Sequence, residues 1–174
     1  MLTSPGSSNL LFWFKAERAM QEIPIRSFAV SVVVLRTDGT RHDVLLLRRT
    51  QTLAGEWCQV AGAIEPGEKA WQAALREVEE ETGLALARLY SADICEQFYE
   101  ADRDAISLLP VFVGFVRQGD AVRLNAEHSE ARWVAFDDAL RMVPFAGQRN
   151  VLRHIENEFV ARQPNRWLLV FSAD

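Results

Sequence analysis

The sequence predicts a mixed α/β fold of the α+β kind, built around one central sheet. Three observations indicate it: several short β-branched runs, two stretches with helical spacing of apolar residues, and a length of 174 residues that suits one domain. Hydrophobic residues make up 49% of the chain and charged residues 25%, which excludes a disordered or fibrous protein. Because no run of about 18 apolar residues is present, we expect no membrane-spanning helix.

Strands are predicted both before and after a central helix. Residues 28–35 are rich in β-branched side chains, residues 37–40 are typical of a turn, and residues 44–47 form the return strand of a hairpin. A short strand is expected near Val60. Three further strands are predicted after the helix, over residues 89–99, 106–116 and 131–136.

Two longer helices and one short helix complete the prediction. Residues 68–82 are helical, and Gly83 suits the position after a helix end. Asp137 is predicted to cap a short helix over 138–143. A longer amphipathic helix is expected over 148–162. We therefore divide the chain into an N-terminal extension (1–22), one domain (23–164) and a C-terminal tail (165–174).

Charge and cysteine content restrict the function. The chain has 19 basic and 24 acidic residues and a net charge of −5, so duplex nucleic acid is not an expected partner. A small anionic ligand remains open if a metal ion reverses the local field. Cys58 and Cys95 fit no CxxC pattern and are expected to be buried small hydrophobic residues in a reducing compartment, which favours a cytoplasmic protein.

The helix predicted over residues 68–82 carries the acidic side chains that indicate a function. At about 100° per residue, one stripe of apolar residues faces the core: Trp71, Ala74, Leu75 and Val78. Glu77, Glu80 and Glu81 form a second stripe beside it, while Glu79 falls on the opposite flank. Because like charges at this spacing repel one another, the acidic stripe indicates a counter-ion. Carboxylate ligands of this kind suit Mg²⁺ or Mn²⁺.

The spacing around this helix forms a specific motif. Its fixed residues are Gly62, Glu68, Arg76, Glu77, Glu80, Glu81 and Gly83, with aliphatic Val78 and Leu84. It resembles the G-x5-E-x7-R-E-U-x-E-E-x-G-U signature of the Nudix hydrolase family, where U is an aliphatic residue. Seven fixed positions match by chance on the order of 10⁻⁸ per starting point. The resemblance implies an α/β/α sandwich with a mixed central sheet and a loop–helix–loop motif.

The resemblance also implies roles for these residues. Glu77, Glu80 and Glu81 would be metal ligands, joined by the backbone carbonyl near Gly62. The structural members of the motif would be Glu68, Arg76 and Gly83. The general base is expected to be a carboxylate of the motif, Glu77 or Glu80, or else Glu127 on a later loop, which would be a further metal ligand.

The stretch from Trp57 to Gly62 resembles the dihydroneopterin triphosphate and dATP pyrophosphohydrolase branch of the family. That resemblance implies cleavage of a nucleoside or pterin triphosphate to a monophosphate and pyrophosphate. Hydrolysis of a dinucleoside polyphosphate is the alternative, indicated by the position of Tyr99. A Nudix-fold nucleotide sensor without catalysis is a lower-ranked possibility, because such proteins usually lose the carboxylates that this chain keeps.

Candidate substrate contacts lie outside the motif. Arg48 and Arg49 follow the second strand and could contact phosphate. Tyr99 and Phe145, together with Phe98, could stack on a base or pterin ring. No role is assigned to the histidines at 42 and 154, and the family resemblance leaves a homodimer open.

Overall fold

The computed structural model describes residues 21–173. Its strands are β1 (Ile25–Arg26), β2 (Ala29–Thr37), β3 (His42–Arg49), β4 (Trp57–Cys58), β5 (Val60–Ala63), β6 (Arg88–Glu100), β7 (Ala105–Phe115), β8 (His128–Val134) and β9 (Leu169–Ser172). Its helices are α2 (Ala70–Thr82), α3 (Phe136–Met142) and α4 (Ala146–Ile155). α4 continues into a π-helical turn, η1 (Glu156–Val160), and a 3-10 turn, η2 (Arg166–Leu168), precedes β9.

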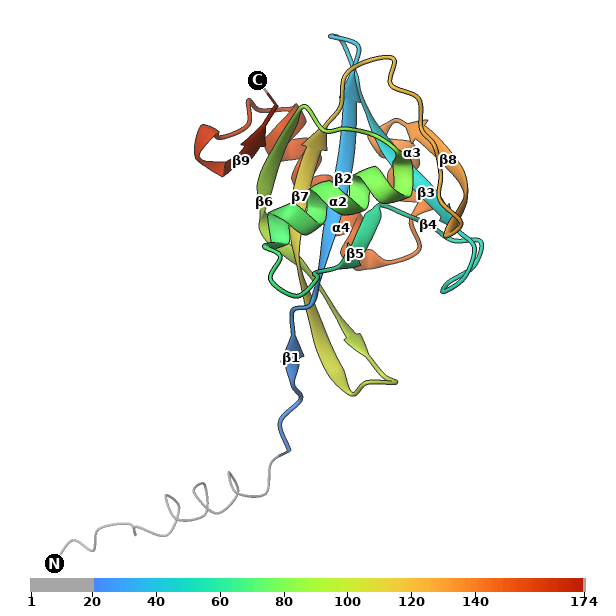
Figure 1. Ribbon diagram of the computed structural model, residues 1–174, viewed down its shortest axis with the longest axis vertical. Coiled ribbons are helices and arrows are strands. Elements are labelled where there is room, and N and C mark those ends of the chain that lie inside the picture. The colour runs from blue at the N-terminus through green and yellow to red at the C-terminus, as the bar shows by residue number, and fades with distance from the viewer. Residues whose placement is uncertain (1–20, 174) are drawn as a thin grey trace, which may run out of the picture.

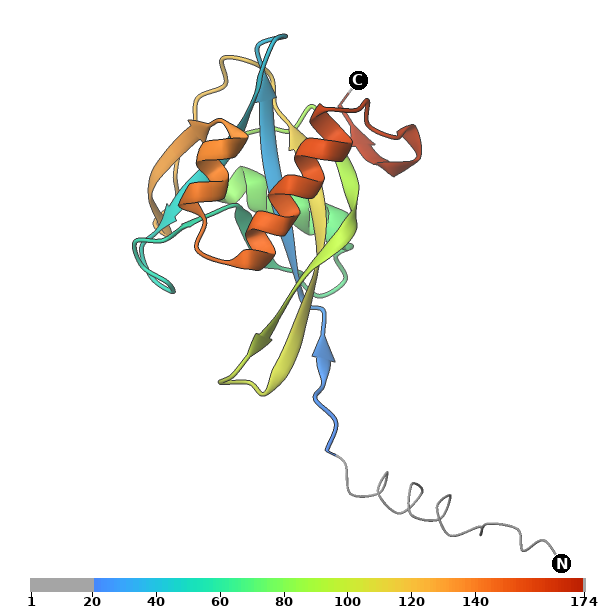
Figure 2. The ribbon, with the colours of Figure 1, turned by 180° about the vertical axis from the view of Figure 1, so that it is seen from behind.

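These strands form one mixed sheet with the central order β4-β3-β2-β7-β6-β9. β7 runs parallel to β2 and β1, and the remaining pairs are antiparallel. α2 covers one face of the sheet (Figure 1), and α3 and α4 cover the other (Figure 2). The predicted α/β/α sandwich is therefore confirmed. Within residues 21–173 no helix is long and apolar enough to cross a bilayer.

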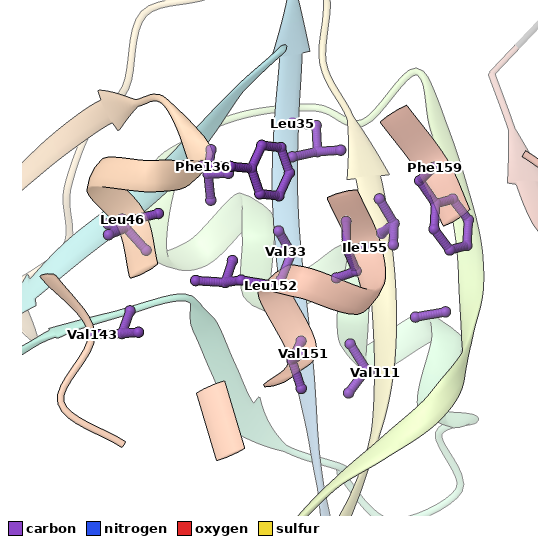
Figure 3. Packing of buried hydrophobic residues seen from close by; sticks show 14 of the residues in the cluster. Val33, Leu35, Leu46, Val111, Phe136, Val143, Val151, Leu152, Ile155 and Phe159 are labelled. Atoms are coloured by element: carbon purple, nitrogen blue, oxygen red, sulfur yellow. The ribbon is translucent and has the colours of Figure 1, made fainter. Parts of the chain in front are cut away.

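The alternation of β2 side chains divides the core into two halves. Val30, Val32 and Val34 face α2, whereas Val33 and Leu35 face α3 and α4. In Figure 3, Val33 lies beside Leu152 of α4 and Leu35 beside Phe136 of α3. Since β2 is buried on both faces, residues 30–35 are apolar except for the buried Ser31 and do not alternate with polar residues.

Several boundaries differ from the predictions. α2 begins at Ala70 rather than at residue 68, because Gln72 turns back to accept a hydrogen bond from the Lys69 backbone N–H at 3.0 Å. α3 begins at Phe136, so Asp137 lies in its first turn instead of capping it; Ala135 occupies the cap. The predicted helix over 148–162 begins earlier, at Ala146, and is α-helical only to Ile155.

The two chain ends have different outcomes. Residues 1–20 of the predicted N-terminal extension lie outside the described residues. Residues 165–172, which the sequence separates from the domain as a tail, form η2 and β9. β9 pairs antiparallel with β6, so this segment extends the sheet at one edge.

Candidate active site

A short turn places the acidic helix against the sheet. β5 ends at Ala63, and α2 begins at Ala70. At the other end of α2, Gly83 adopts the left-handed conformation with φ 66° and its N–H donates to the Glu79 carbonyl at 2.7 Å. An L side chain is strained in that conformation, which explains a glycine at this point of the motif.

Arg76 ties the helix to the preceding turn. Its Nε and Nη2 donate to the two carboxylate oxygens of Glu68 at 3.1 and 3.0 Å, and Nη2 also donates to the Ala63 carbonyl at 2.7 Å. Nη1 donates to Glu77 at 2.8 Å and to Glu80 at 3.1 Å. The bonds to Arg76 hold the pKa of Glu68 below its usual range. Arg76 and Glu68 thus lie as their proposed structural role requires.

This network predicts a stability defect in Arg76→Ala. Because three carboxylates and one carbonyl would lose their donor, we expect a loss of about 1–2 kcal/mol in the free energy of unfolding. Urea denaturation followed by circular dichroism measures it. Arg153→Ala is the matched control, since Arg153 is exposed and, among residues 21–173, its side chain bonds only to Asn150 on its own helix. Equal midpoints for the two variants would contradict the structural role of Arg76.

The absence of a side chain at Gly62 leaves space for the Glu77 carboxylate. A Cβ atom at position 62 would lie 1.9 Å from Cδ of Glu77, far inside any allowed contact. Burial raises the pKa of Glu77, and Arg76 acts against that shift. The charges of Glu80 and Glu127 raise it further, so these carboxylates interact. Glu80 itself is 55% exposed.

Glu81 is the most constrained carboxylate of the motif. It is buried, and its Oε2 has no hydrogen-bond partner. Burial raises its pKa to about 8, helped by the charges of Glu77 and Glu127 and opposed by Arg49. The neighbouring His128 is also buried, with Nε2 3.9 Å from Glu81 Oε2 and with no partner for Nδ1. Burial and the charge of Arg49 lower the pKa of His128, which favours the neutral ring.

The donor set fits a divalent cation. Hard carboxylate oxygens cluster on α2, and the buried Oε2 of Glu81 accepts no hydrogen bond from the described residues. No three acidic, imidazole or thiol side chains within residues 21–173 already surround a common point. Arg76 forms ion pairs with the carboxylates of Glu77 and Glu80.

A cavity of about 490 Å³ opens next to the motif, on the α4 side of the sheet. Its wall includes Arg49 and Ala61, and Phe98, Tyr99 and Phe145 contribute aromatic side chains that are 45–55% exposed. Arg48 does not line it; this side chain bonds to the Gly55 carbonyl and approaches Glu130 at 3.7 Å. The two arginines separate because adjacent strand residues point to opposite faces.

The cavity also contains polar residues that received no role from the sequence. Gln59 Nε2 donates to Ser31 Oγ at 3.0 Å and to Glu96 Oε2 at 2.9 Å, and Gln59 Oε1 is buried without a partner. Burial raises the pKa of Glu96. The available signal was a polar residue in an apolar stretch, since Gln59 lies between β4 and β5, next to buried Cys58 and Val60.

Comparison with known proteins decides the family. A family model described as NUDIX domain matches residues 26–155. The chain belongs to the Nudix hydrolase family. This Nudix chain is 36% identical to an octanoyltransferase of Myxococcus xanthus over 80% of its own length and 39% of that protein's. It is 29% identical to an asymmetrical bis(5'-nucleosyl)-tetraphosphatase of Caenorhabditis elegans, over 72% of its own length and 91% of that protein's.

Solved Nudix structures share the architecture. A MutT protein from Methanosarcina mazei is 28% identical and superposes with a TM-score of 0.65, covering 79% of this chain and 97% of that one. The Nudix chain spans well under half of the length of the Myxococcus relative, and therefore that protein's activity does not transfer to it.

Proposed function

We propose that this Nudix chain hydrolyses a phosphoric anhydride bond of a nucleoside polyphosphate by attack of water on phosphorus. The observation that carries the proposal is the position of β5. Ala61 lines the 490 Å³ cavity, and the next residue, Gly62, packs against Glu77 on the opposite face. A base in the cavity would therefore place its phosphate chain at the edge of β5, beside the carboxylates.

A divalent cation completes the chemistry. Glu77, Glu80 and Glu81 are the side chains that would hold it, together with the backbone near Gly62. When bound, such an ion polarises a phosphoryl oxygen and lowers the pKa of a coordinated water. Mg²⁺ and Mn²⁺ both suit this donor set.

The remaining roles fall to residues around the cavity. Arg49 is the candidate phosphate ligand, because it lines the cavity and its charge acts on Glu81 and His128. Glu127 is the candidate base: it is exposed, and its carboxylate is not bound to Arg76. In the reaction, a water O–H proton passes to the Glu127 carboxylate as the new P–O bond forms. The bridging P–O bond breaks, and the leaving phosphate takes the electron pair.

Two substrate classes are consistent with this site. Cleavage of a nucleoside or pterin triphosphate to a monophosphate and pyrophosphate follows from the Trp57–Gly62 stretch. Hydrolysis of a dinucleoside polyphosphate is favoured by the three exposed rings at the cavity, which offer stacking surface for a second base. The tetraphosphatase of Caenorhabditis elegans, which is matched over nearly its whole length, supports the same candidate.

Cysteine catalysis receives no support from the site. Cys95 is exposed rather than buried as the sequence predicts, but it does not line the cavity. Cys58 is buried, and burial raises the pKa of its thiol to about 11, so a thiolate nucleophile is disfavoured at neutral pH.

The test is a substrate panel with Mg²⁺ and with Mn²⁺, and with products separated by ion-exchange chromatography. The panel contains the dNTPs, dihydroneopterin triphosphate and diadenosine tetraphosphate. Pyrophosphate from a triphosphate supports the first class, and ATP with AMP from diadenosine tetraphosphate supports the second. We expect Arg49→Gln to raise KM by about tenfold or more, because a charged hydrogen bond to phosphate is lost.

Glu80→Gln and Glu79→Gln are a matched pair for this panel. Both residues are exposed on α2, but only Glu80 belongs to the acidic stripe. Activity that is lost in Glu80→Gln and kept in Glu79→Gln supports the proposal. Equal turnover by both variants would contradict it, and metal-dependent binding without turnover would favour a nucleotide sensor.

A further inference from the structure

A second large cavity lies at the opposite end of α4. The 490 Å³ cavity includes the first residues of α4, whereas the second, of about 530 Å³, includes the end of η1 and the segment that follows it. No residue lines both cavities. In Figure 2, α4 and η1 cross the sheet obliquely and end beside β9. The second cavity is thus separate from the catalytic carboxylates.

The wall of the second cavity is strongly basic. Arg88, Arg162 and Arg166 line it, together with His42, and no aspartate or glutamate does. This is unexpected in a chain in which acidic residues outnumber basic ones by 24 to 19. The positive charges come from three separate places: the start of β6, the turn after η1 and the turn before β9. Neutralising the carbonyl end of a helix would not explain Arg88, which lies on a strand.

Two of these arginines have no acidic partner. Within residues 21–173, Arg88 and Arg166 form no ion pair; each lies over an aromatic ring, Arg88 over Phe115 at 5.8 Å and Arg166 over Trp167 at 4.8 Å. Only Arg162 meets a carboxylate, that of Glu158 on its own helical segment, at 2.9 Å. A guanidinium without a carboxylate partner retains its fork of donors for an external anion.

The floor of the cavity is aromatic and rigid. Tyr90 and Phe159 are buried, with ring centroids 6.0 Å apart, and Phe115 meets Tyr90 edge to face at 5.8 Å. The His42 ring meets Phe115 edge to face, with ring centroids 6.4 Å apart. Basic side chains above a fixed apolar floor form a setting for a molecule with a charged end and a flat apolar part.

Most residues of the outer wall lie outside the part of the chain that the family model matches. The family match ends at residue 155, whereas Phe159 to Leu169 contribute eight of the cavity's 13 residues: Phe159, Val160, Ala161, Arg162, Gln163, Pro164, Arg166 and Leu169. This segment begins with the π-helical turn η1, a distortion found frequently at functional sites. β9 then fixes it to the edge of the sheet through β6.

We propose that this cavity is a second binding site, for a small anion that carries a phosphoryl group. Arg88 and Arg166 would bind the phosphoryl oxygens, and the Phe115 side of the cavity would accept an apolar or aromatic part. A nucleotide supplies both features, whereas inorganic pyrophosphate supplies only the first. The site does not depend on the proposed hydrolysis, since none of its residues belongs to the catalytic motif.

The test is titration of the ¹⁵N-labelled full chain, in EDTA, with AMP and separately with pyrophosphate. Amide shifts at residues 88, 115 and 160–169 report the second site, and shifts at 59–61 and 96–99 report the first. We expect saturable shifts in the former group. AMP binding at least tenfold tighter than pyrophosphate identifies a nucleotide as the ligand, and equal or tighter pyrophosphate binding identifies a simple phosphate anion.

Charge-matched variants make the result specific. Arg88→Gln with Arg166→Gln should weaken binding at the second site at least tenfold and leave the shifts of the first site unchanged. Arg141→Gln with Arg153→Gln removes the same charge from exposed positions outside both cavities and should change neither. The proposal is overturned if no shifts occur near residues 160–169, or if both double variants weaken binding equally.

Discussion

Gly62→Ala should lower the hydrolytic rate by about 100-fold or more while the protein stays folded. The new Cβ would lie 1.9 Å from Glu77 Cδ, so the carboxylate must leave its position beside β5. The backbone tolerates alanine, because Gly62 is not among the glycines with positive φ. Steady-state kinetics on the substrate that the panel identifies, together with a thermal melt, measure the two effects separately.

Gly114→Ala is the crossed control for this variant. Gly114 also lies on a strand without positive φ, and its Cβ would lie 2.7 Å from the buried Leu86 side chain, remote from the carboxylates. Overpacking of this kind costs about 1–3 kcal/mol. We therefore expect Gly114→Ala to lose stability and keep its rate constant below the melting temperature. The explanation for Gly62 is contradicted if Gly62→Ala and Gly114→Ala show the same loss of stability and the same change in rate.

Glu81→Gln should stabilise the metal-free protein at pH 8. Burial raises the pKa of Glu81 from 4.5 to about 8, so the folded state holds a proton that the unfolded chain releases near pH 4.5. The contribution of Glu81 to the free energy of unfolding is therefore largest below about pH 4.5 and decreases as the pH rises toward 8. The span corresponds to about 5 kcal/mol as an upper bound. Urea denaturation in EDTA across pH 5–9 measures the slope, which Glu81→Gln should remove.

Divalent metal should reverse the order of these two proteins. A cation bound at Glu81 compensates the buried negative charge of this carboxylate. At about 5 mM, a concentration on the order that weak oxygen-ligand sites need, Mg²⁺ should therefore stabilise the wild type at pH 8 more than it stabilises Glu81→Gln. Glu79→Gln, on the exposed flank of α2, should behave as the wild type does. Parallel pH curves for the wild type and Glu81→Gln would show that this carboxylate is not the source of the slope.

The motif could be predicted because its chemistry depends on local spacing. One helical turn decides which glutamates share a stripe, and the structure confirms that Glu79 is exposed while Glu81 is buried. The strands were predicted for the same reason, since β-branched runs such as 29–37 are local signals. The two-residue strands β1 and β4 were missed because two residues show no periodicity, and the four-residue β9 was missed because its segment was predicted to be a tail, although β5, of the same length, was predicted.

Long-range packing could not be derived from local spacing. The pairing of β3 with β8 shifts its register between Arg48 and Arg49, and no local pattern in the sequence indicates that shift. The hydrogen bond from Gln59 to Glu96 joins two residues that are 37 positions apart in the sequence. The basic cavity depends on the pairing of β9 with β6, and no local pattern in residues 165–174 predicts that pairing.

β5 lies between the cavity and the Glu77 carboxylate, and this position limits how the length of the strand can change during evolution. Ala61 and Gly62 serve opposite faces of the sheet because they are neighbours on a strand. A single inserted or deleted codon in β5 would exchange their directions and place a methyl group where Glu77 needs space. The exposed turn at residues 38–40 lines neither of these sites, and local hydrogen bonds to Asp38 Oδ1 hold its conformation. Length variation among descendants of this gene should therefore accumulate in that turn and be purged from β5.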